Sequence, residues 1–416
     1  MKAQKSDRLL LIAFSWCPRG GVGSRRWSKF AKYLTREGWR VDVITASYPI
    51  RDKVNWCKDI SNNPSIVSYP TKSGYPSYLL RPGRNFLVKV ADRVLNYLTH
   101  NIDYAQRWSP HMQRQCSKLL RQHSYRAVVM TVGPFTPLID FHKLKEQHPD
   151  NYFILDYRDP WSYRHDQVSR TSKRSLMEME ARAVAAADAV WVTTQEHKEA
   201  YALLFPGIAE KIYVLTNGFD PEDFPEIATV KRNTNQWIAV HPGSLFGERF
   251  DTLLMLVWGL IKIDSPILKE KFRIHVYTSS QLLTRKIPRE LAEAFDHYVV
   301  SKEAISPSEM MSVLATAKFG LTLDISEHHL TIPSKTFDYI GLGIKLILLG
   351  PDGAIPNEIK EAGHYVAPIN DDSISSLLQK IVAQETGGEP LEKNAHLIKK
   401  YGLNNLQQEL LRLLPE

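Results

Sequence analysis

Twice in this chain a short apolar run leads into a glycine turn and then into a helical pattern. The first run is Leu9–Trp16, followed by Gly20-Gly21-Val22-Gly23; the second is Trp237–Val240, followed by His241-Pro242-Gly243-Ser244-Leu245. Apolar runs of this length without helical period are typical of strands buried in a parallel sheet. A strand, a turn and a helix in this order form the building unit of α/β proteins. The pattern therefore predicts two α/β domains, each with its own glycine turn.

The length of 416 residues agrees with two domains of roughly 200 residues each. We expect the first domain over residues 1–216 and a linker rich in proline and polar residues over 217–235. The second domain is then expected over 236–395, and a last helix over 396–416.

The composition is that of a folded protein, with 43% hydrophobic and 24% charged residues. No apolar run reaches the ~18 residues that a membrane span needs, and the start leads directly into a strand, so we expect a cytoplasmic protein. Cys17, Cys57 and Cys116 show no metal-site spacing. We expect all three to be free thiols in a reducing compartment.

Positive charge is concentrated in the first half of the chain. Residues 1–200 hold 32 Lys and Arg against 18 Asp and Glu, whereas the remainder holds 21 against 27. A basic half indicates an anionic partner such as phospholipid, a lipid diphosphate or nucleic acid. The basic residues are scattered and form no recognised nucleic-acid-binding module, so no specific nucleic acid is expected.

Within the basic half, residues 77–100 combine several arginines with one apolar helical face. Such a helix can lie in the interface of an anionic membrane, which would make the protein peripheral on the inner face of the cell membrane. The alternative is a helix packed on its own domain.

Residues 332–343 contain a candidate anion site. Pro333 and Ser334 predict a helix start, with serine capping backbone N–H groups. Lys335 follows at the positive end of this helix, where the N–H groups and the dipole favour phosphate. Asp338, one turn later, could accept hydrogen bonds from ribose hydroxyls. The alternative is a solvated Lys-x-x-Asp face.

Further candidate residues come directly after predicted strands. Gly133 follows the strand 125–131, and Asp156, Arg158 and Asp159 lie at the end of the next strand. In a parallel sheet such residues face the ligand crevice, although an internal Arg–Asp ion pair bracing the loop is an equally open reading. The first glycine turn matches G-x-G-x-x-G only partly, with Arg26 in the last glycine position. It favours close approach of a phosphate or sugar more than a dinucleotide site, and a plain tight turn is the alternative.

The sequence offers no motif for holding a metal on a diphosphate. It contains no Asp-x-Asp, no dense Cys/His cluster and no Walker-type G-x-x-x-x-G-K-[ST]. A departing diphosphate would then be stabilised by positive side chains, for which Arg249 and Lys335 are the candidates. No metal and no cofactor are expected.

Five motifs in this order resemble family 4 of the retaining glycosyltransferases, and the closest similarity is to the branch acting in bacterial surface-polysaccharide synthesis. The motifs are Gly-Gly-Val-Gly (20–23), Asp-Tyr-Arg-Asp-Pro-Trp (156–161), Asn-Gly-Phe-Asp (217–220), Gly-Ser-Leu (243–245) with Arg249, and Pro-Ser-Lys-Thr-Phe-Asp-Tyr (333–339). The resemblance covers nearly the whole chain. It implies the GT-B fold, in which two Rossmann-like domains face each other across a cleft and the C-terminal helix returns to the first domain.

The resemblance also implies a function and roles for residues. It implies metal-independent transfer of a sugar, with retention, from a UDP- or GDP-sugar to a glycan or lipid-diphosphate-linked acceptor. Arg249 and Lys335 would bind the donor diphosphate and act in catalysis, and Asp338 would bind the ribose. Gly133, Arg158 and Asp159 would line the acceptor side, with Asp159 as the best candidate for a catalytic base. Other donor-binding residues would be Gly21, Gly23, Gly243, Ser244, Tyr277, Ile305 and Ser334.

The chain departs from the family pattern in its acidic motif. The shorter Asp338 occupies the second position of Glu-x7-Glu, and Leu330 stands in the first. No basic residue follows shortly after Arg249, and no histidine ends the strand before Gly133. A UDP-sugar 2-epimerase of the same fold, a non-catalytic scaffold and an anion- or nucleic-acid-binding protein therefore stay open as alternatives.

Overall fold

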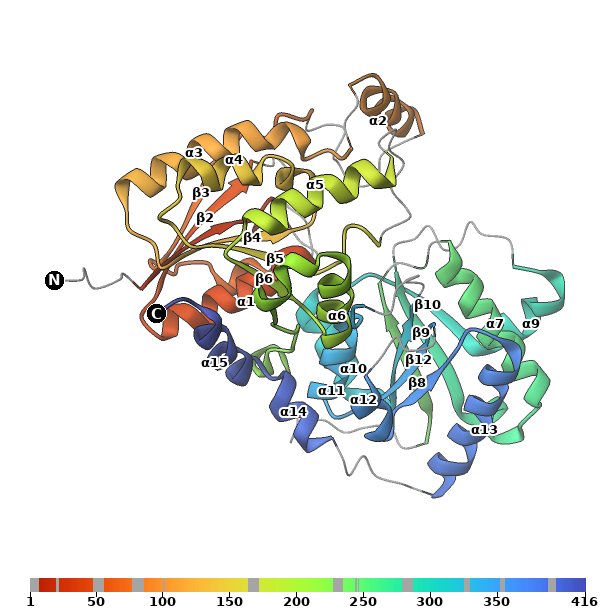
Figure 1. Cartoon of the computed structure of the whole chain (residues 1–416). Helices are drawn as coiled ribbons and strands as arrows, with labels where there is room; N and C mark the ends of the chain where they lie inside the picture. Colours follow the sequence, from red (N-terminus) through yellow and green to blue (C-terminus); the bar gives the residue numbers. More distant parts are fainter. Residues whose placement is uncertain are drawn as a thin grey trace. The chain divides into compact units, whose positions relative to one another are not determined.

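The chain divides into two units, each built around one parallel sheet (Figure 1). Unit 1 contains Met1–Thr216 together with Leu406–Glu416, and unit 2 contains Asn217–Asn405. The computed structural model describes residues 7–19, 22–47, 56–76, 86–99, 102–163, 172–226, 235–243, 245, 247–278, 287–324, 330–351, 356–387 and 394–416.

The sheet of unit 1 has 7 strands in the order β3-β2-β1-β4-β5-β6-β7. All of its strand pairs are parallel. The strands are β1 (Arg8–Ile12), β2 (Arg40–Ala46), β3 (Ile66–Thr71), β4 (Ala127–Val132), β5 (Phe153–Tyr157), β6 (Ala189–Val192) and β7 (Ile212–Val214). The strand order reverses between β1 and β4, which is where doubly wound sheets bind their ligands.

Helices cover both faces of this sheet. Figure 1 shows α3, α4 and α5 over one face, and α1 with α15 over the other. The helices are α1 (Val22–Arg36), α2 (Phe86–Thr99), α3 (Ser109–Gln122), α4 (Phe141–Gln147), α5 (Lys173–Ala186), α6 (Gln195–Leu204) and α15 (Leu403–Leu413). The apolar positions Trp27, Phe30 and Leu34 of α1 recur at helical spacing and are buried, as the sequence pattern predicts.

The C-terminal helix α15 joins unit 1. Gln407 Nε2 donates a hydrogen bond to Glu37 Oε1 at 2.7 Å, and Arg126 Nη1 donates to the carbonyl of Pro415 at 3.4 Å. The predicted return of this helix to the first domain is thus confirmed. The prediction of one continuous last helix is wrong, because α14 (Ala395–Tyr401) ends where Gly402 forms a β-bridge with Phe219.

Unit 2 contains a 6-stranded sheet in the order β10-β9-β8-β11-β12-β13, again with parallel pairs throughout. The strands are β8 (Trp237–Pro242), β9 (Phe272–Thr278), β10 (Val299–Glu303), β11 (Phe319–Leu323), β12 (Lys345–Leu349) and β13 (Tyr365–Ala367). The first six positions of the sheet in unit 1 have the same relative order, so both units share one topology, and here the order reverses between β8 and β11. The two parallel α/β domains predicted from the glycine turns are confirmed.

Two hydrophobic cores lie against the sheet of unit 2. One gathers residues of α7, α9 and α13, and the other gathers residues of α10, α11, α12 and α14. The remaining helices of this unit are α7 (Glu248–Ile263), α8 (Pro266–Lys271), α9 (Arg289–Tyr298), α10 (Pro307–Thr316), α11 (Ser334–Gly341), α12 (Asn357–Glu361) and α13 (Asp371–Gly387).

The expectation of three free cysteines is wrong for two of them. Cys17, in the loop after β1, forms a disulfide with Cys57, which opens the 3₁₀ helix η1 (Cys57–Asp59) after β2. These cysteines are 40 positions apart, and only the parallel pairing of β1 with β2 brings their loops to one edge of the sheet. Cys116 is a free thiol buried on α3, and burial raises the pKa of this thiol.

Candidate functional site

In unit 2 the predicted site residues gather where the strand order reverses. Gly243 directly follows β8, and α11, which carries Lys335, follows β11. The carboxyl ends of neighbouring parallel strands open onto one crevice at such a point. The topology therefore places the loop of Gly243 and the start of α11 at the position where ligands bind in this kind of sheet.

Packing fixes helix α11 against the sheet. Gly320 of β11 has no side chain, and the ring of Tyr339 occupies the space that a Cβ would need there. The hydroxyl of Tyr339 donates to the carbonyl of Leu321 at 3.2 Å. Phe337 and Ile340 are buried, as the sequence predicts. The helix begins at Ser334 with Pro333 as its N-cap and without a side-chain cap, so the predicted serine cap is wrong.

The ammonium group of Lys335 lies against the backbone of Gly243. A Cβ at Gly243 would lie 3.0 Å from Lys335 Nζ, and Gly243 has a φ of +115°, which favours glycine. The Gly243 N–H donates to the carbonyl of Tyr277 at 2.8 Å, so this N–H is already used within the protein. Glycine at this position thus makes room for the lysine rather than offering its own donor to a ligand.

Lys335 and Arg249 form a pair of cations. Burial, and then the positive charge of Arg249 in the first turn of α7, lower the pKa of Lys335 to about 8. Among the described residues, neither side chain has an ion pair or hydrogen bond with a carboxylate. Two neighbouring positive charges are unfavourable unless an anion binds between them. The arrangement is therefore that of an anion site at the positive end of a helix.

The structure describes the positions of most of the other predicted donor residues. Asp338 is buried on α11, Ser334 is the first residue of that helix, and Ile305 is half-buried before α10. Tyr277 is buried near the end of β9 and reaches the site through its carbonyl bond with Gly243. The predicted residues Gly21 and Ser244 lie outside the described residues.

In unit 1 the structure brings together three predicted residues. Arg158, just after β5, lays its guanidinium beside Gly23 in the first turn of α1 and Gly133 after β4. A Cβ at Gly23 would lie 2.8 Å from Arg158 Nη1, and a Cβ at Gly133 would collide with Nη2. Arg158 Nη2 donates to the carbonyls of Gly133 at 3.2 Å and Val132 at 3.4 Å. Asp159 is partly exposed, and no described residue forms a hydrogen bond or ion pair with its carboxylate.

The internal ion pair that the sequence left open for Arg158 is wrong for the described residues, because Arg158 donates to carbonyls. The buried Arg–Asp pair of this region instead joins Asp156 to Arg26. Asp156 is fully buried and accepts hydrogen bonds from Arg26 Nη2 at 2.9 Å, Arg26 Nε at 3.2 Å and Trp27 Nε1 at 2.7 Å. Arg26 also donates to the carbonyls of Leu215 and Thr216. Arg26, which occupies the last glycine position of the G-x-G-x-x-G pattern, therefore stabilises unit 1. No spacing in the sequence predicts this role.

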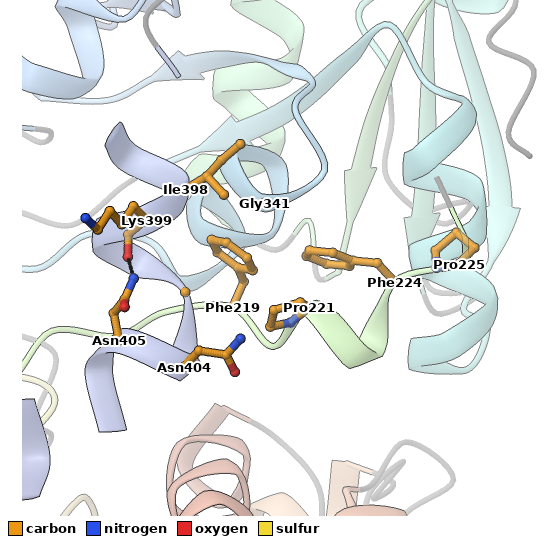
Figure 2. Close-up of a pocket in the computed structure, with 10 residues that line it drawn as sticks. Phe219, Pro221, Phe224, Pro225, Gly341, Ile398, Lys399, Asn404 and Asn405 are labelled. Atoms are coloured by element: carbon orange, nitrogen blue, oxygen red, sulfur yellow. Dashed lines mark hydrogen bonds between the residues drawn. The ribbon is translucent and has the colours of Figure 1, made fainter. Parts of the chain in front are cut away.

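An apolar pocket of about 460 Å³ lies at the other end of α11 (Figure 2). It is lined by Phe219, Pro221, Phe224, Pro225, Gly341, Ile398, Lys399, Gly402, Asn404 and Asn405. None of the predicted site residues borders this pocket.

Comparison with known proteins gives a family match for unit 1 and a fold match for the whole chain. A family model described as Glycosyltransferase Family 4 matches residues 20–223. No curated protein matches the sequence significantly.

Solved structures match at low identity over nearly their full length. Sucrose-phosphate synthase from Thermosynechococcus elongatus is 14% identical with a TM-score of 0.67, and the match covers 98% of both chains. HepE from Anabaena in complex with UDP is 12% identical with a TM-score of 0.62, over 97% of this chain and 98% of that one. The catalytic domain of starch synthase IV from Arabidopsis thaliana, bound to ADP and acarbose, is 9% identical with a TM-score of 0.62, over 98% of both. These similarities show the fold, which is GT-B-like.

Proposed function

We propose that the chain, whose residues 20–223 match the model of Glycosyltransferase Family 4, is a retaining glycosyltransferase of that family that works without a metal ion. It takes a sugar from a UDP- or GDP-sugar bound in unit 2 and transfers it to a glycan or lipid-linked acceptor bound in unit 1. The motif resemblance favours an acceptor of bacterial surface-polysaccharide synthesis.

The observation that carries this proposal is the cation pair of Arg249 and Lys335, of which Lys335 lies against Gly243. Breaking the bond between the sugar and the diphosphate leaves negative charge on the departing phosphate oxygens. Two fixed cations at a helix N-terminus stabilise this developing charge, which is the work that a metal ion does in other enzymes. Each charge-assisted hydrogen bond would contribute roughly 1.5–3 kcal/mol. Asp338, one turn along α11, is proposed to bind the ribose.

On the acceptor side, Asp159 and Arg158 are the proposed residues. The family resemblance implies that the acceptor attacks from the face that the diphosphate leaves, so a phosphate oxygen can take the proton. Asp159 is the proposed alternative base, and the absence of a partner for its carboxylate among the described residues supports this role.

A donor panel tests the proposal. We expect one sugar nucleotide among UDP-, GDP-, ADP- and dTDP-sugars to raise the Tm of the protein by several degrees, equally with and without EDTA, because binding to the folded state alone stabilises it. Incubation of that donor without acceptor should leave the sugar unchanged, whereas a 2-epimerase would convert it. No Tm shift with any donor, or a shift that EDTA abolishes, would contradict the proposal.

We also propose that helix α2 binds an anionic lipid surface. Its apolar residues are exposed to an unusual degree: Phe86 to 76%, Leu87 to 74%, Val94 to 49% and Val90 to 38%. The excess of basic residues over 1–200 supplies the complementary charge. Of the predicted segment 77–100, residues 77–85 and 100 lie outside the described residues. No helix in the described part of the chain is both long and apolar enough to span a membrane.

Replacing Phe86 and Leu87 by aspartate should reduce binding to vesicles of phosphatidylglycerol and phosphatidylcholine by roughly tenfold or more, because a buried side chain of this size contributes about 1.5–3 kcal/mol. Leu203→Asp on α6 is the matched control, since Leu203 is 82% exposed outside α2. Vesicle flotation measures the effect. Equal flotation of the double variant and the wild type would mean that α2 does not contact lipid.

A further inference from the structure

Two arginines of unit 1, Arg26 on α1 and Arg158 directly after β5, differ in how they are paired. Arg26 is almost fully buried and uses its guanidinium on a carboxylate and two carbonyls, at distances of 2.8 to 3.2 Å. Within the described residues, the guanidinium of Arg158 makes only two hydrogen bonds, at 3.2 and 3.4 Å, and both go to carbonyls. Its Nε is buried without any hydrogen-bond partner among the described residues. Arg26 is therefore a structural residue, whereas Arg158 keeps donors that the described part of the protein does not use.

The backbone around Arg158 is shaped to receive its guanidinium. Any side chain at Gly23 or Gly133 would press on the guanidinium nitrogens. Gly133 also has a φ of +114°, and Gly23 lies in the first turn of α1, whose N-terminus carries partial positive charge. A buried N–H group without a partner, such as Arg158 Nε, is rare in folded proteins, and the planar edge of a guanidinium matches the geometry of a phosphate or carboxylate.

We infer that Arg158, over Gly23 and Gly133, binds a compact oxyanion of a substrate, either a phosphate or a carboxylate group. This inference rests on the proposed function. In a sugar transfer, it means that one of the two substrates carries an anionic group in addition to the diphosphate of the donor. The anion belongs either to the acceptor or to the donor sugar, as in a uronic acid. The site lies entirely within unit 1.

Inorganic phosphate titrated calorimetrically into the full chain tests the inference. The titration is done in a Lys335→Met background, which removes the proposed donor site, so that the remaining saturable phosphate site is that of Arg158. Adding Arg158→Gln should weaken phosphate binding roughly ten- to hundredfold. Adding Gly23→Ala should weaken it several-fold, since only the flexible end of Arg158 must shift to admit the methyl group. Adding Gly207→Ala is the control, because nothing lies within 4 Å of a Cβ there.

Phosphate binding that Arg158→Gln leaves unchanged, or the absence of any saturable phosphate site in the Lys335→Met background, would overturn the inference. UDP binding by the Lys335→Met variant is measured separately. If this variant still binds UDP, the proposed function has failed, whatever the result for Arg158. UDP-glucose and UDP-glucuronate then distinguish the sources. If the protein binds UDP-glucuronate more tightly than UDP-glucose and Arg158→Gln removes this preference, the anion belongs to the donor sugar. If the two affinities are equal both with Arg158 and in the Arg158→Gln variant, the anion belongs to the acceptor.

Discussion

Lys335→Met should abolish measurable binding of a nucleoside diphosphate and at the same time make the protein more stable. Burial and the charge of Arg249 lower the pKa of Lys335 from 10.5 to about 8 in the folded protein. Each pKa unit corresponds to about 1.4 kcal/mol, so the charged lysine destabilises the fold at neutral pH by on the order of 3 kcal/mol. Methionine has similar volume and no charge. Denaturant unfolding and calorimetry with UDP and GDP measure the two effects.

The direction of the pH dependence follows from the same pKa. Because the folded protein holds the Lys335 proton more weakly than the unfolded chain, the destabilisation is complete below pH 8 and disappears as the pH rises toward 10.5. Nucleotide affinity should be greatest below pH 8 and fall above it, since the anion requires the protonated lysine. Lys335→Arg should retain binding without this dependence, because arginine stays charged.

Lys380→Met on the exposed side of α13 is the matched control and should change neither stability nor binding. A Lys335→Met protein that binds the nucleotide as the wild type does would contradict the assignment of the donor site. A Lys335→Met protein that is less stable would show that the lysine has a structural partner.

Asp156→Ala should destabilise unit 1 by about 3–5 kcal/mol. The variant leaves the guanidinium of Arg26 and the indole N–H of Trp27 buried without the carboxylate that accepts their hydrogen bonds. Breaking one side of a buried ion pair has this effect because the remaining charge is not compensated. Urea unfolding followed by tryptophan fluorescence measures the loss, since Trp27 and Trp191 stack within unit 1.

Asp159→Ala provides the comparison for Asp156→Ala. Asp159 is partly exposed and has no partner among the described residues, so its loss should change stability by less than about 0.5 kcal/mol. Transfer activity should nevertheless fall if Asp159 acts on the acceptor. Equal stability of the two alanine variants would mean that the Arg26–Asp156 pair does not brace the unit.

Local patterns in the sequence were sufficient to predict the architecture. The strand Arg40–Ala46 and the helical face of Trp27, Phe30 and Leu34 follow from periodicity, which reports burial directly. The two glycine turns predicted two sheets of the same kind, and the position of Lys335 after a strand placed it near the point of strand reversal. Each of these predictions depends on residues close together in the sequence.

The wrong predictions concern contacts between residues far apart in the sequence. The disulfide of Cys17 with Cys57 and the pair of Arg26 with Asp156 span 40 and 130 positions and depend on how the strands are ordered. The last helix breaks at Gly402 because its backbone pairs with distant Phe219. The close approach of Lys335 to Gly243 was not predicted for the same reason, because it depends on the pairing of β8 with β11.

A crystal structure of the protein with a bound nucleoside diphosphate tests the central claim most directly. We predict that oxygen atoms of the diphosphate lie within hydrogen-bond distance of Lys335 Nζ and the guanidinium of Arg249, with the ribose toward Asp338. A nucleotide bound elsewhere, with Lys335 and Arg249 making no contact to it, would contradict the account.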